Sequence, residues 1–296
     1  MASVKMVAVI GAGVMGRGIA QVCAQAGCQV VLNDVHTPAL KKAINAIKWS
    51  VGKFVEKGRL TEDTDAIMCR IRTDTELSGV SEADLIIEAV FEDLRVKQGV
   101  IEELDSLAKP GALLASNTSA IPVTDLAAVT QAPQRVVGLH FFNPVPMMKA
   151  VEVVRGMQTS PGSVDKATAF VRQLGMEPIT VERDVPGFLL NRINLVGYVE
   201  AIRLVESGVG NVEDIDKGVR LAFGRKMGPF ETGDIVGLDV SCGALTAIYE
   251  DSRDDRFFPP QLLRRKVKAG DLGRKTGKGW YSWGEDGTRG DPYRRP

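Results

Sequence analysis

The sequence predicts an α/β protein in which a mainly parallel, doubly wound sheet domain is followed by an all-helical domain. Three observations lead to this fold class. β-rich runs alternate with helical patterns along the first part of the chain, a glycine-rich turn follows the first run, and the β-rich runs largely stop after Phe188. Such alternation favours a parallel sheet. Arg183–Gly187 contains a Pro-Gly break, so we expect the domain boundary there, with domains at residues 1–184 and 185–296.

The composition is that of an ordinary globular protein. Of the 296 residues, 44% are hydrophobic and 25% are charged, and Lys+Arg balance Asp+Glu at 37 each. This balance creates no overall field that would favour nucleic acid or an anionic membrane. No apolar run approaches the roughly 20 residues that a membrane-spanning helix needs. We therefore expect no nucleic-acid partner and no membrane partner.

The N-terminus and the cysteines predict a cytoplasmic protein without a metal. The first strand begins almost at once, which leaves no room for a signal or transit segment. The four cysteines have neither CxxC spacing nor the density of a disulfide scaffold, so we expect buried reduced thiols at Cys23, Cys28, Cys69 and Cys242. Two isolated histidines and scattered cysteines make no ligand set, so no metal site is expected.

A dinucleotide-binding turn is predicted near the N-terminus. Val4–Ile10 is a candidate strand, Arg17–Ala26 has a helical pattern, and the motif Gly-x-Gly-x-x-Gly lies between them. The first two glycines permit a tight turn and the close approach of a pyrophosphate, while the third lets the helix pack on the strand. The helix start offers N–H groups to the phosphates. The predicted cofactor-binding residues here are Gly11, Gly13, Val14, Met15 and Gly16.

The acid that ends the second strand predicts which dinucleotide binds. Gln29–Asn33 is the second candidate strand, and Asp34 follows it directly. Its distance from the glycines is about the 20 residues typical of a Rossmann-like domain. An acid at this place accepts hydrogen bonds from the ribose hydroxyls and repels a 2′-phosphate, which favours NAD over NADP. A glycine-rich turn that binds no nucleotide is the alternative interpretation.

The next elements continue the alternation. Thr37–Lys57 is predicted as a helix whose lysine-bearing face is most simply solvated, with binding of a phosphorylated substrate ranked second. The other elements predicted here are strands at Cys69–Arg72, Asp84–Ala89 and Ala112–Ala115, and a helix at Asp93–Ala108. Four small polar residues, Ser116–Ser119, then follow the last of these strands, where hydrogen-bonding groups can line a site.

One stretch, Gly138–Glu152, holds the candidate catalytic pair. His140 closes an apolar run that is predicted as a buried strand, two prolines then force a turn, and a valine-rich strand carries Glu152. Two short strands joined by a tight connection can place the two side chains next to each other. A histidine backed by a buried carboxylate suits a base that works near neutral pH. A core histidine with Glu152 exposed at a sheet edge explains this stretch equally well.

The second half of the chain is predicted to be helical. A helix at Gly162–Leu174 and a strand at Pro178–Val181 complete the first domain. Beyond the boundary, the predicted elements are helices at Leu189–Val205 and Asn211–Leu221, followed by helix-breaking segments at Met227–Glu231 and Gly233–Asp239 and a frayed end from Glu285 onward. The first of these helices is apolar nearly all round, which fits either a dimer interface or a buried core helix.

Seven blocks of sequence resemble the L-3-hydroxyacyl-CoA dehydrogenase family, and in particular its short bacterial 3-hydroxybutyryl-CoA dehydrogenases. In chain order they are GAGVMGRGIAQ (11–21), EAVFEDLRVK (88–97), SNTS (116–119), GLHFFNPVPMMKAVEV (138–153), PGFLLNR (186–192), MGPFE (227–231) and GRKTGKGWY (273–281). The blocks span nearly the whole chain, so the series is far more specific than the glycine motif alone. The resemblance implies a Rossmann-like NAD-binding domain, a helical substrate and homodimerisation domain, and a cleft between the two.

The resemblance also implies roles for single residues. His140 matches the catalytic base and Glu152 its partner, while Ser119 and Asn191 match the substrate-contacting serine and asparagine. The cofactor contacts implied are Asp34, Glu92, Lys97, Asn117, Ser119, Asn143 and Lys275, and the coenzyme A contacts matched only loosely are Lys53 and Lys57. Ala120 stands where many relatives carry a second serine, and no role depends on it.

These roles describe an oxidoreductase of fatty acid metabolism that uses NAD and an acyl-CoA substrate. His140 would take the hydroxyl proton as hydride leaves C3, and Glu152 would stabilise the imidazolium. Ser119 and Asn191 would contribute one group from each domain, which couples the chemistry to domain closure as a hypothesis. Two alternatives remain at this point. One is a related 3-hydroxy acid dehydrogenase acting on a free small or sugar acid, and the other is a non-catalytic NAD-binding protein that kept the fold.

Overall fold

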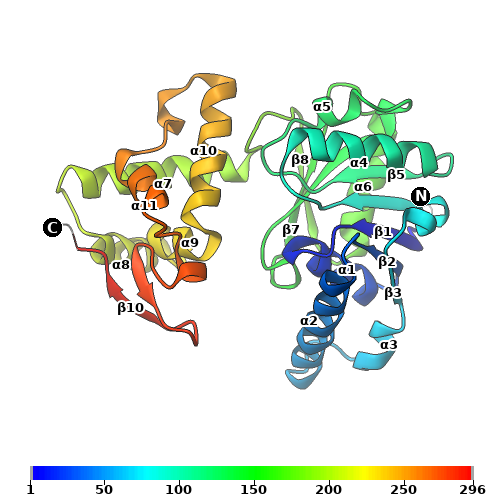
Figure 1. Ribbon diagram of the computed structural model, residues 1–296, viewed down its shortest axis with the longest axis horizontal. Helices are drawn as coiled ribbons and strands as arrows, with labels where there is room; N and C mark the ends of the chain where they lie inside the picture. Colours follow the sequence, from blue (N-terminus) through cyan, green and yellow to red (C-terminus); the bar gives the residue numbers. More distant parts are fainter. Residues whose placement is uncertain (1–2, 295–296) are drawn as a thin grey trace. The chain divides into compact units, whose positions relative to one another are not determined.

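The computed structural model describes residues 3–294 and forms two compact units, Met1–Asp184 and Val185–Pro296. The first unit is built on an eight-stranded sheet, counted in the described residues, with the strand order β3-β2-β1-β4-β5-β6-β7-β8 (Figure 1). Its strands are β1 (Met6–Ile10), β2 (Gln29–Asn33), β3 (Ile71–Asp74), β4 (Leu85–Glu88), β5 (Leu113–Ser116), β6 (Val136–Phe141), β7 (Ala150–Val154) and β8 (Glu177–Val181). The α/β fold class is therefore confirmed.

Helices cover both faces of this sheet. The α-helices are α1 (Val14–Gln25), α2 (Thr37–Glu56), α3 (Thr64–Met68), α4 (Leu94–Leu107), α5 (Val123–Ala127) and α6 (Pro161–Gln173). The short 3₁₀ turns are η1 (Leu77–Glu82), η2 (Pro133–Arg135) and η3 (Val145–Met147). One predicted strand, Cys69–Arg72, was placed two residues too early, because Cys69 closes the short helix α3, which the sequence pattern did not reveal.

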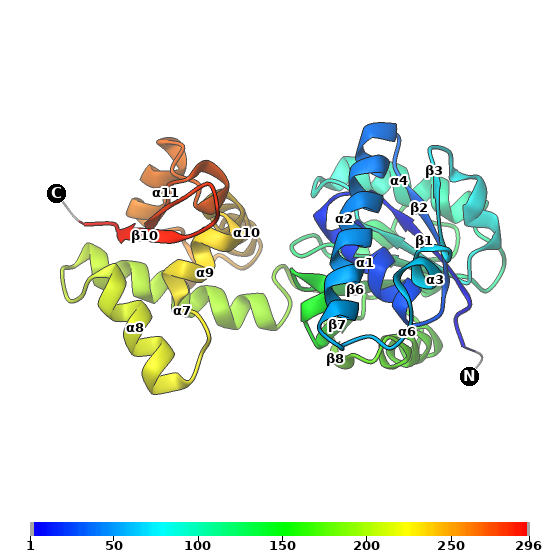
Figure 2. The same cartoon turned by 90° about the horizontal axis from the view of Figure 1, so that it is seen from below.

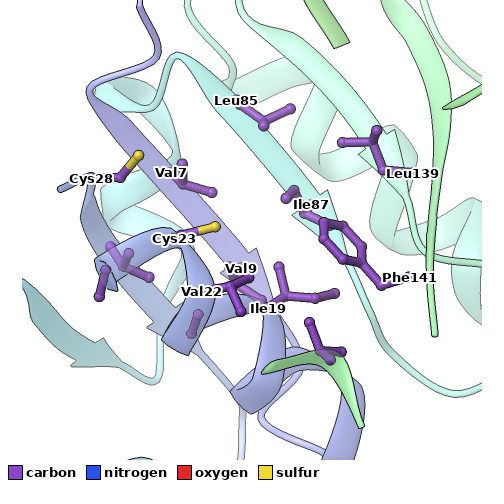
Figure 3. Packing of buried hydrophobic residues seen from close by; sticks show 14 of the residues in the cluster. Val7, Val9, Ile19, Val22, Cys23, Cys28, Leu85, Ile87, Leu139 and Phe141 are labelled. Atoms are coloured by element: carbon purple, nitrogen blue, oxygen red, sulfur yellow. The ribbon is translucent and has the colours of Figure 1, made fainter. Parts of the chain in front are cut away.

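The main core lies between the sheet and helices α1, α2 and α6. Alternate residues of the strands point to this side, because side chains alternate along a strand. Figure 3 shows Val7 and Val9 of β1, Leu139 of β6 and Ile19 of α1 in one cluster of buried side chains. The other residues of the strands face α4 and α5, and the sheet register puts His140, Glu152 and the buried Glu88 on that face.

The strand order explains where a ligand can bind. β2 lies on one side of β1 and β4 on the other, and both pair with β1 in parallel. The chain therefore reverses its winding direction between these strands, and in open α/β sheets ligands bind at such a point, outside the carboxyl ends of the strands. Two strands run in the opposite direction to the other six. β7 is antiparallel to β6 and pairs His140 with Glu152, and β8 is parallel to β7.

The second unit is helical, as predicted, apart from a C-terminal hairpin. Its helices are α7 (Leu190–Glu206), α8 (Val212–Phe223), α9 (Pro229–Val236), α10 (Leu238–Ser252) and α11 (Gln261–Lys268), with 3₁₀ turns η4 (Asp255–Phe257) and η5 (Arg274–Thr276). Strands β9 (Tyr281–Trp283) and β10 (Arg289–Pro292) pair antiparallel, and Figure 2 shows β10 in red. The expectation of a frayed end from Glu285 was therefore wrong for residues 289–292, while residues 295 and 296 lie outside the described range.

Of the two predicted helix breaks in this unit, one needs correction and the other is confirmed. Met227–Glu231 does not interrupt a helix but starts one, because Gly228 is the N-cap of α9 and Pro229 occupies its first position, where a proline is well tolerated. The predicted break within Gly233–Asp239 is confirmed, because Gly237, with its positive φ of 109°, separates α9 from α10. Helix α7 directs Val199 and Ile202 into the core of its own unit, so this face of the helix is a core face.

A buried carboxylate fixes the hairpin of the second unit. Asp234 in α9 accepts hydrogen bonds from the backbone N–H groups of Trp280, at 2.8 Å, and Tyr281, at 2.9 Å. The indole N–H of Trp283 donates to the same carboxylate at 2.8 Å. Burial raises the pKa of Asp234, although these three donors act in the opposite direction. Asp234 thus supplies acceptors to a turn whose backbone could not otherwise be buried.

We expect Asp234→Asn to destabilise the second unit by about 2 kcal/mol, because the amide nitrogen would face an N–H donor. The raised pKa makes this effect depend on pH. The carboxyl group contributes stability that is fully present below its ordinary value of 3.8 and is lost as pH rises through the raised value. Asparagine does not titrate, so the wild type should exceed the variant by more at about pH 4 than at pH 7. Urea unfolding followed by tryptophan fluorescence measures both gaps, and a gap that widens toward pH 7 would contradict the prediction.

Candidate active site

The predicted site residues of the first unit gather at one edge of its sheet. Gly11 follows β1, Asp34 follows β2, Glu92 follows β4 and Ser119 follows β5, and these strands are parallel neighbours. His140 lies at the next-to-last position of β6, which is parallel to β5. The carboxyl ends of parallel strands share one edge, so the topology brings together residues that are far apart in the sequence.

The glycine turn has the geometry that a pyrophosphate requires. Gly11 has φ of 101°, and a Cβ on it would lie 2.6 Å from the carbonyl oxygen of Ala89, so only glycine fits. A Cβ on Gly13 would meet nothing within 4 Å, which leaves open space beside the start of α1. No side chain caps this helix start. Its N–H groups and the open space in front of them suit the phosphates of a dinucleotide.

Asp34 is held in place by the turn that it faces. Its carboxylate accepts the backbone N–H of Ala12 through Oδ2 and that of His36 through Oδ1, both at 2.9 Å. These bonds fix the carboxylate at the end of β2, next to the glycine turn. Each oxygen has a second lone pair, so the group can also accept a ribose hydroxyl. The arrangement fits NAD, as predicted, and would place a negative charge against a 2′-phosphate.

His140 and Glu152 form a buried pair. Nδ1 of His140 lies 2.6 Å from Oε2 of Glu152, and the two residues are direct cross-strand partners in β6 and β7. His140 is 5% exposed and Glu152 is 0% exposed, so the interpretation with Glu152 at an exposed sheet edge is excluded. β8 covers the other side of β7. A carboxylate that accepts a hydrogen bond from Nδ1 fixes the orientation of the imidazole ring and favours the tautomer with the proton on that nitrogen.

The polar segment after β5 is organised by Glu92. Oε1 of Glu92 accepts the backbone N–H of Ser119 at 2.8 Å, that of Ala120 at 3.1 Å and the hydroxyl of Thr118 at 2.7 Å. Burial alone would raise the pKa of Glu92, but the Lys97 ammonium and these donors lower it. Asn117 accepts the backbone N–H of Phe141 at 2.9 Å, which ties this segment to the strand that carries the histidine.

Lys97 and Asn143 differ in their surroundings. Lys97 is 1% exposed, and its ammonium contacts Glu88 at 2.7 Å and Glu92 at 3.2 Å. It therefore lies behind Glu92 rather than on an open surface. Asn143 is exposed in the connection between β6 and η3.

The two lysines proposed for coenzyme A lie far along α2. Lys53 is half-buried in the last turn of the helix and pairs with Glu56 at 2.7 Å, while Lys57, the C-cap, is exposed. A helix rises about 1.5 Å per residue, so they lie more than 20 Å along the axis from the helix start after Asp34. Only an elongated ligand could contact both regions.

Two predicted residues belong to the second unit. Asn191 lies in the first turn of α7 and is half-buried. Lys275 is exposed in η5, and its ammonium pairs with Asp239 at 2.7 Å. Burial would raise the pKa of Asp239, but this lysine lowers it.

Three residues that contact predicted site residues were missed by sequence reasoning. Glu88 and Ser116 contact each other behind the cofactor site, where Glu88 also binds Lys97, and Asp239 binds Lys275. Glu88 ends a strand of buried leucine and isoleucine, so an acid at the end of an apolar run was a usable signal. Its partners lie 9 and 28 residues away, and no periodicity relates such spacings.

Within the described residues, 3–294, neither a metal site nor a membrane-spanning helix is found. No group of three or more histidine, cysteine, aspartate or glutamate side chains in this range could hold a metal ion. No helix in the same range is both long enough and apolar enough to cross a membrane.

The glycine turn and the acid after β2 define the first unit as an NAD-binding domain, and with the buried pair at the same edge they define the protein as an NAD-dependent oxidoreductase. Comparison with known families agrees. Residues 6–185 match the family described as "3-hydroxyacyl-CoA dehydrogenase, NAD binding domain", and residues 187–283 match "3-hydroxyacyl-CoA dehydrogenase, C-terminal domain". The chain belongs to the 3-hydroxyacyl-CoA dehydrogenase family.

Individual relatives are similar over almost their full lengths. A 3-hydroxybutyryl-CoA dehydrogenase from Bradyrhizobium diazoefficiens is 41% identical, with 95% of this chain and 96% of the relative covered. One from Clostridioides difficile is 38% identical, with 93% and 98% covered. The crystal structure of (S)-3-hydroxybutyryl-CoA dehydrogenase from Ralstonia eutropha aligns with a TM-score of 0.91 at 38% identity, covering 96% of this chain and all of the other.

Proposed function

We propose that this protein catalyses the reversible NAD-dependent oxidation of a short-chain L-3-hydroxyacyl-CoA, such as 3-hydroxybutyryl-CoA, to the 3-oxoacyl-CoA. The observation that carries the proposal is the 2.6 Å contact between His140 and Glu152 at the same sheet edge as the glycine turn. A proton acceptor beside a hydride-carrier site is what oxidation of a secondary alcohol requires. The substrate class is supported by the names of the relatives.

In this proposal His140 is the general base in oxidation and the general acid in reduction. With Nδ1–H donated to Glu152, the lone pair of the neutral ring lies on Nε2, which takes the hydroxyl proton. The carboxylate of Glu152 stabilises the imidazolium that results. When bound, NAD accepts the hydride from C3 of the substrate. The residues proposed to hold it are those of the glycine turn, with Asp34 for its ribose hydroxyls and Glu92, Asn117, Ser119, Asn143 and Lys275 as further contacts. Lys97, which the resemblance also implies as a contact, is buried behind Glu92.

Ser119 and Asn191 are proposed to bind the reacting part of the substrate, and Lys53 and Lys57 the phosphates of coenzyme A. The second assignment is supported by the positive charges of the two side chains, because an ammonium group can pair with a phosphate. A homodimer formed through the second unit is also proposed. It is supported by apolar side chains such as Leu221 and Phe223 of α8, which are 78% and 73% exposed. Four free thiols support a cytoplasmic location.

The test is the reduction of acetoacetyl-CoA followed by loss of NADH absorbance, repeated with NADPH. We expect turnover with NADH and a much lower kcat/KM with NADPH, because Asp34 opposes the 2′-phosphate. Free acetoacetate and free 3-hydroxy sugar acids are compared in the same assay. A higher kcat/KM for a free acid would replace the proposal by the related 3-hydroxy acid dehydrogenase. NADH binding without turnover of any of these compounds would instead favour a non-catalytic protein.

We expect Asn191→Ala to lower kcat by roughly 10- to 100-fold while the Kd for NADH stays within about twofold. The proposed amide contact is to the substrate, so its loss removes transition-state stabilisation without changing the cofactor site. Asn194→Ala, an exposed position on the same helix, is the matched control and should keep full activity. Steady-state kinetics and NADH fluorescence measure the two quantities. A variant that loses NADH affinity but keeps kcat would contradict the assignment.

A further inference from the structure

Glu88 is a fully buried carboxylate at the carboxyl end of β4, and the proposed chemistry gives it no role. Both of its oxygens have partners. Oε1 accepts the backbone N–H of Val90 and the ammonium of Lys97, both at 2.7 Å, and Oε2 accepts the hydroxyl of Ser116 at 2.5 Å. A buried charge is costly compared with an apolar side chain of similar size, even when it is paired. The groups that Glu88 contacts are therefore the groups that it can hold in position.

The partner of Glu88 is a lysine with no hydrogen-bond donor to spare. The Lys97 ammonium donates to Glu88 at 2.7 Å and to the carbonyl oxygen of Val90 at 3.4 Å, and it lies 3.2 Å from Oε2 of Glu92. An ammonium has three N–H donors, and three groups surround this one, two as hydrogen-bond acceptors and Glu92 as an ion-pair partner. Lys97 thus links a buried carboxylate to one whose side chain is 39% exposed.

Glu92 in turn holds the backbone of the segment after β5 through hydrogen bonds. Its second oxygen, Oε1, accepts the backbone N–H groups of Ser119 and Ala120 and the hydroxyl of Thr118. These three donors belong to consecutive residues. The position of the Glu92 carboxylate therefore sets the backbone that presents Ser119.

A second connection from Glu88 reaches the same segment. The hydroxyl of Ser116 donates to Glu88, and the Ser116 oxygen lies 3.2 Å from the backbone nitrogen of Thr118, which donates to it. Glu88 and Ser116 are also direct partners in neighbouring parallel strands. Both routes therefore begin at one carboxylate and end in residues 116–120.

We propose that Glu88 is a positioning residue for the cofactor site, acting through Lys97 and Ser116 to hold Glu92 and the segment 116–120 in the conformation that binds NAD. The inference rests on the proposed function in one respect, because Glu92 and Ser119 are taken as ligand contacts. It assigns Lys97 to the support of Glu92. It also explains why a charged group lies between two buried strands instead of another isoleucine.

The first experiment compares Glu88→Gln with wild type in direct titrations of NADH, followed by fluorescence. Glutamine keeps the size of the side chain but removes the charge that orients Lys97. We expect the Kd for NADH to rise roughly tenfold or more, the effect of losing a hydrogen bond to a charged group. A folded variant whose Kd stays within about twofold of wild type would overturn the proposal.

A matched control separates positioning from general destabilisation. Asp105 of α4 is also buried, and it forms an ion pair with Arg135 at 2.6 Å. This pair lies at the other end of α4 and before β6 begins, away from the carboxyl ends of the strands. Asp105→Asn should lower the thermal midpoint but leave the Kd for NADH unchanged. An equal rise in Kd in both variants would mean that Glu88 acts only through stability, which overturns the proposal.

A double-mutant cycle tests the route. If part of the effect of Glu88 passes through Lys97, the loss of NADH affinity in the double variant Glu88→Gln/Lys97→Met is smaller than the sum of the two single losses. Fully additive losses would overturn the route. Should Glu88→Gln fail to fold, Ser116→Ala replaces it. This variant removes one hydrogen bond and should raise the Kd about threefold to tenfold, while an unchanged Kd would overturn the proposal.

The failure of this inference can be told apart from that of the proposed function. NADH titrations need no acyl-CoA, so a wild-type protein that binds NADH but does not reduce acetoacetyl-CoA would reject the proposed function and leave the Glu88 comparison valid. An active wild type with an unchanged Kd in folded Glu88→Gln would reject only the positioning role.

Discussion

His140→Gln is expected to bind NADH with a Kd within about twofold of wild type and to be almost inactive. Glutamine can still reach the Glu152 carboxylate with its amide, so the buried acceptor at 2.6 Å keeps a donor. It cannot take up a proton near neutral pH. General-base catalysis contributes on the order of 10²–10⁴-fold, so kcat should fall by that factor.

The chain contains a natural control for this experiment. His36, the other histidine, is exposed in the turn that starts α2, and His36→Gln should keep full activity. Stopped-flow turnover of acetoacetyl-CoA and NADH fluorescence give kcat and Kd for both variants. Activity of His140→Gln within about tenfold of wild type would remove this residue from the role of base.

The second large effect is expected for Glu152→Gln, which should lower kcat by about 10²–10³-fold with little change in NADH affinity. The amide can donate a hydrogen to Nδ1 of His140, which would move the ring proton to Nε2 and remove the lone pair that accepts the substrate proton. The imidazolium would also lose its neighbouring negative charge. Both effects act on the chemical step.

A conservative variant distinguishes this role from a structural one. Glu152→Asp keeps the charge but shortens the reach, so it should recover part of the lost kcat. The thermal midpoint of each variant is measured in parallel, because Glu152 is fully buried and its replacement also affects stability. A Glu152→Gln protein that retains kcat within about threefold of wild type would show that the carboxylate is not needed for catalysis.

Most of the first unit could be predicted because its signals are local. The strand at Gln29–Asn33 was predicted with the bounds that the structure has, and the glycine turn was predicted from the steric needs of a tight turn. The pairing of His140 with Glu152 was predicted from a short antiparallel connection, since the turn fixes the register of such strands. These features depend on neighbours in sequence.

The second unit shows where local signals fail. The hairpin of β9 and β10 was missed because its strands are short and follow glycine-rich turns, and it is fixed by Asp234, 46 residues before Trp280. The core face of α7 could not be told from an interface face, because an apolar pattern is the same in both. Both the hairpin and the core face of α7 depend on residues that are far away in the sequence.

The sequence by itself determined the class of fold and the dinucleotide turn, because both follow from steric rules that act over a few residues. It offered the pair of His140 and Glu152 as one of two interpretations, and the structure excluded the other. Only the tertiary structure decided that Glu88, Lys97, Glu92 and the segment after β5 form one connected network. Those residues meet because parallel strands place their carboxyl ends at a common edge, whatever their separation along the chain. A buried charge is stable only beside partners that the fold brings to it, and the spacing of these residues in the sequence does not predict which partners those are.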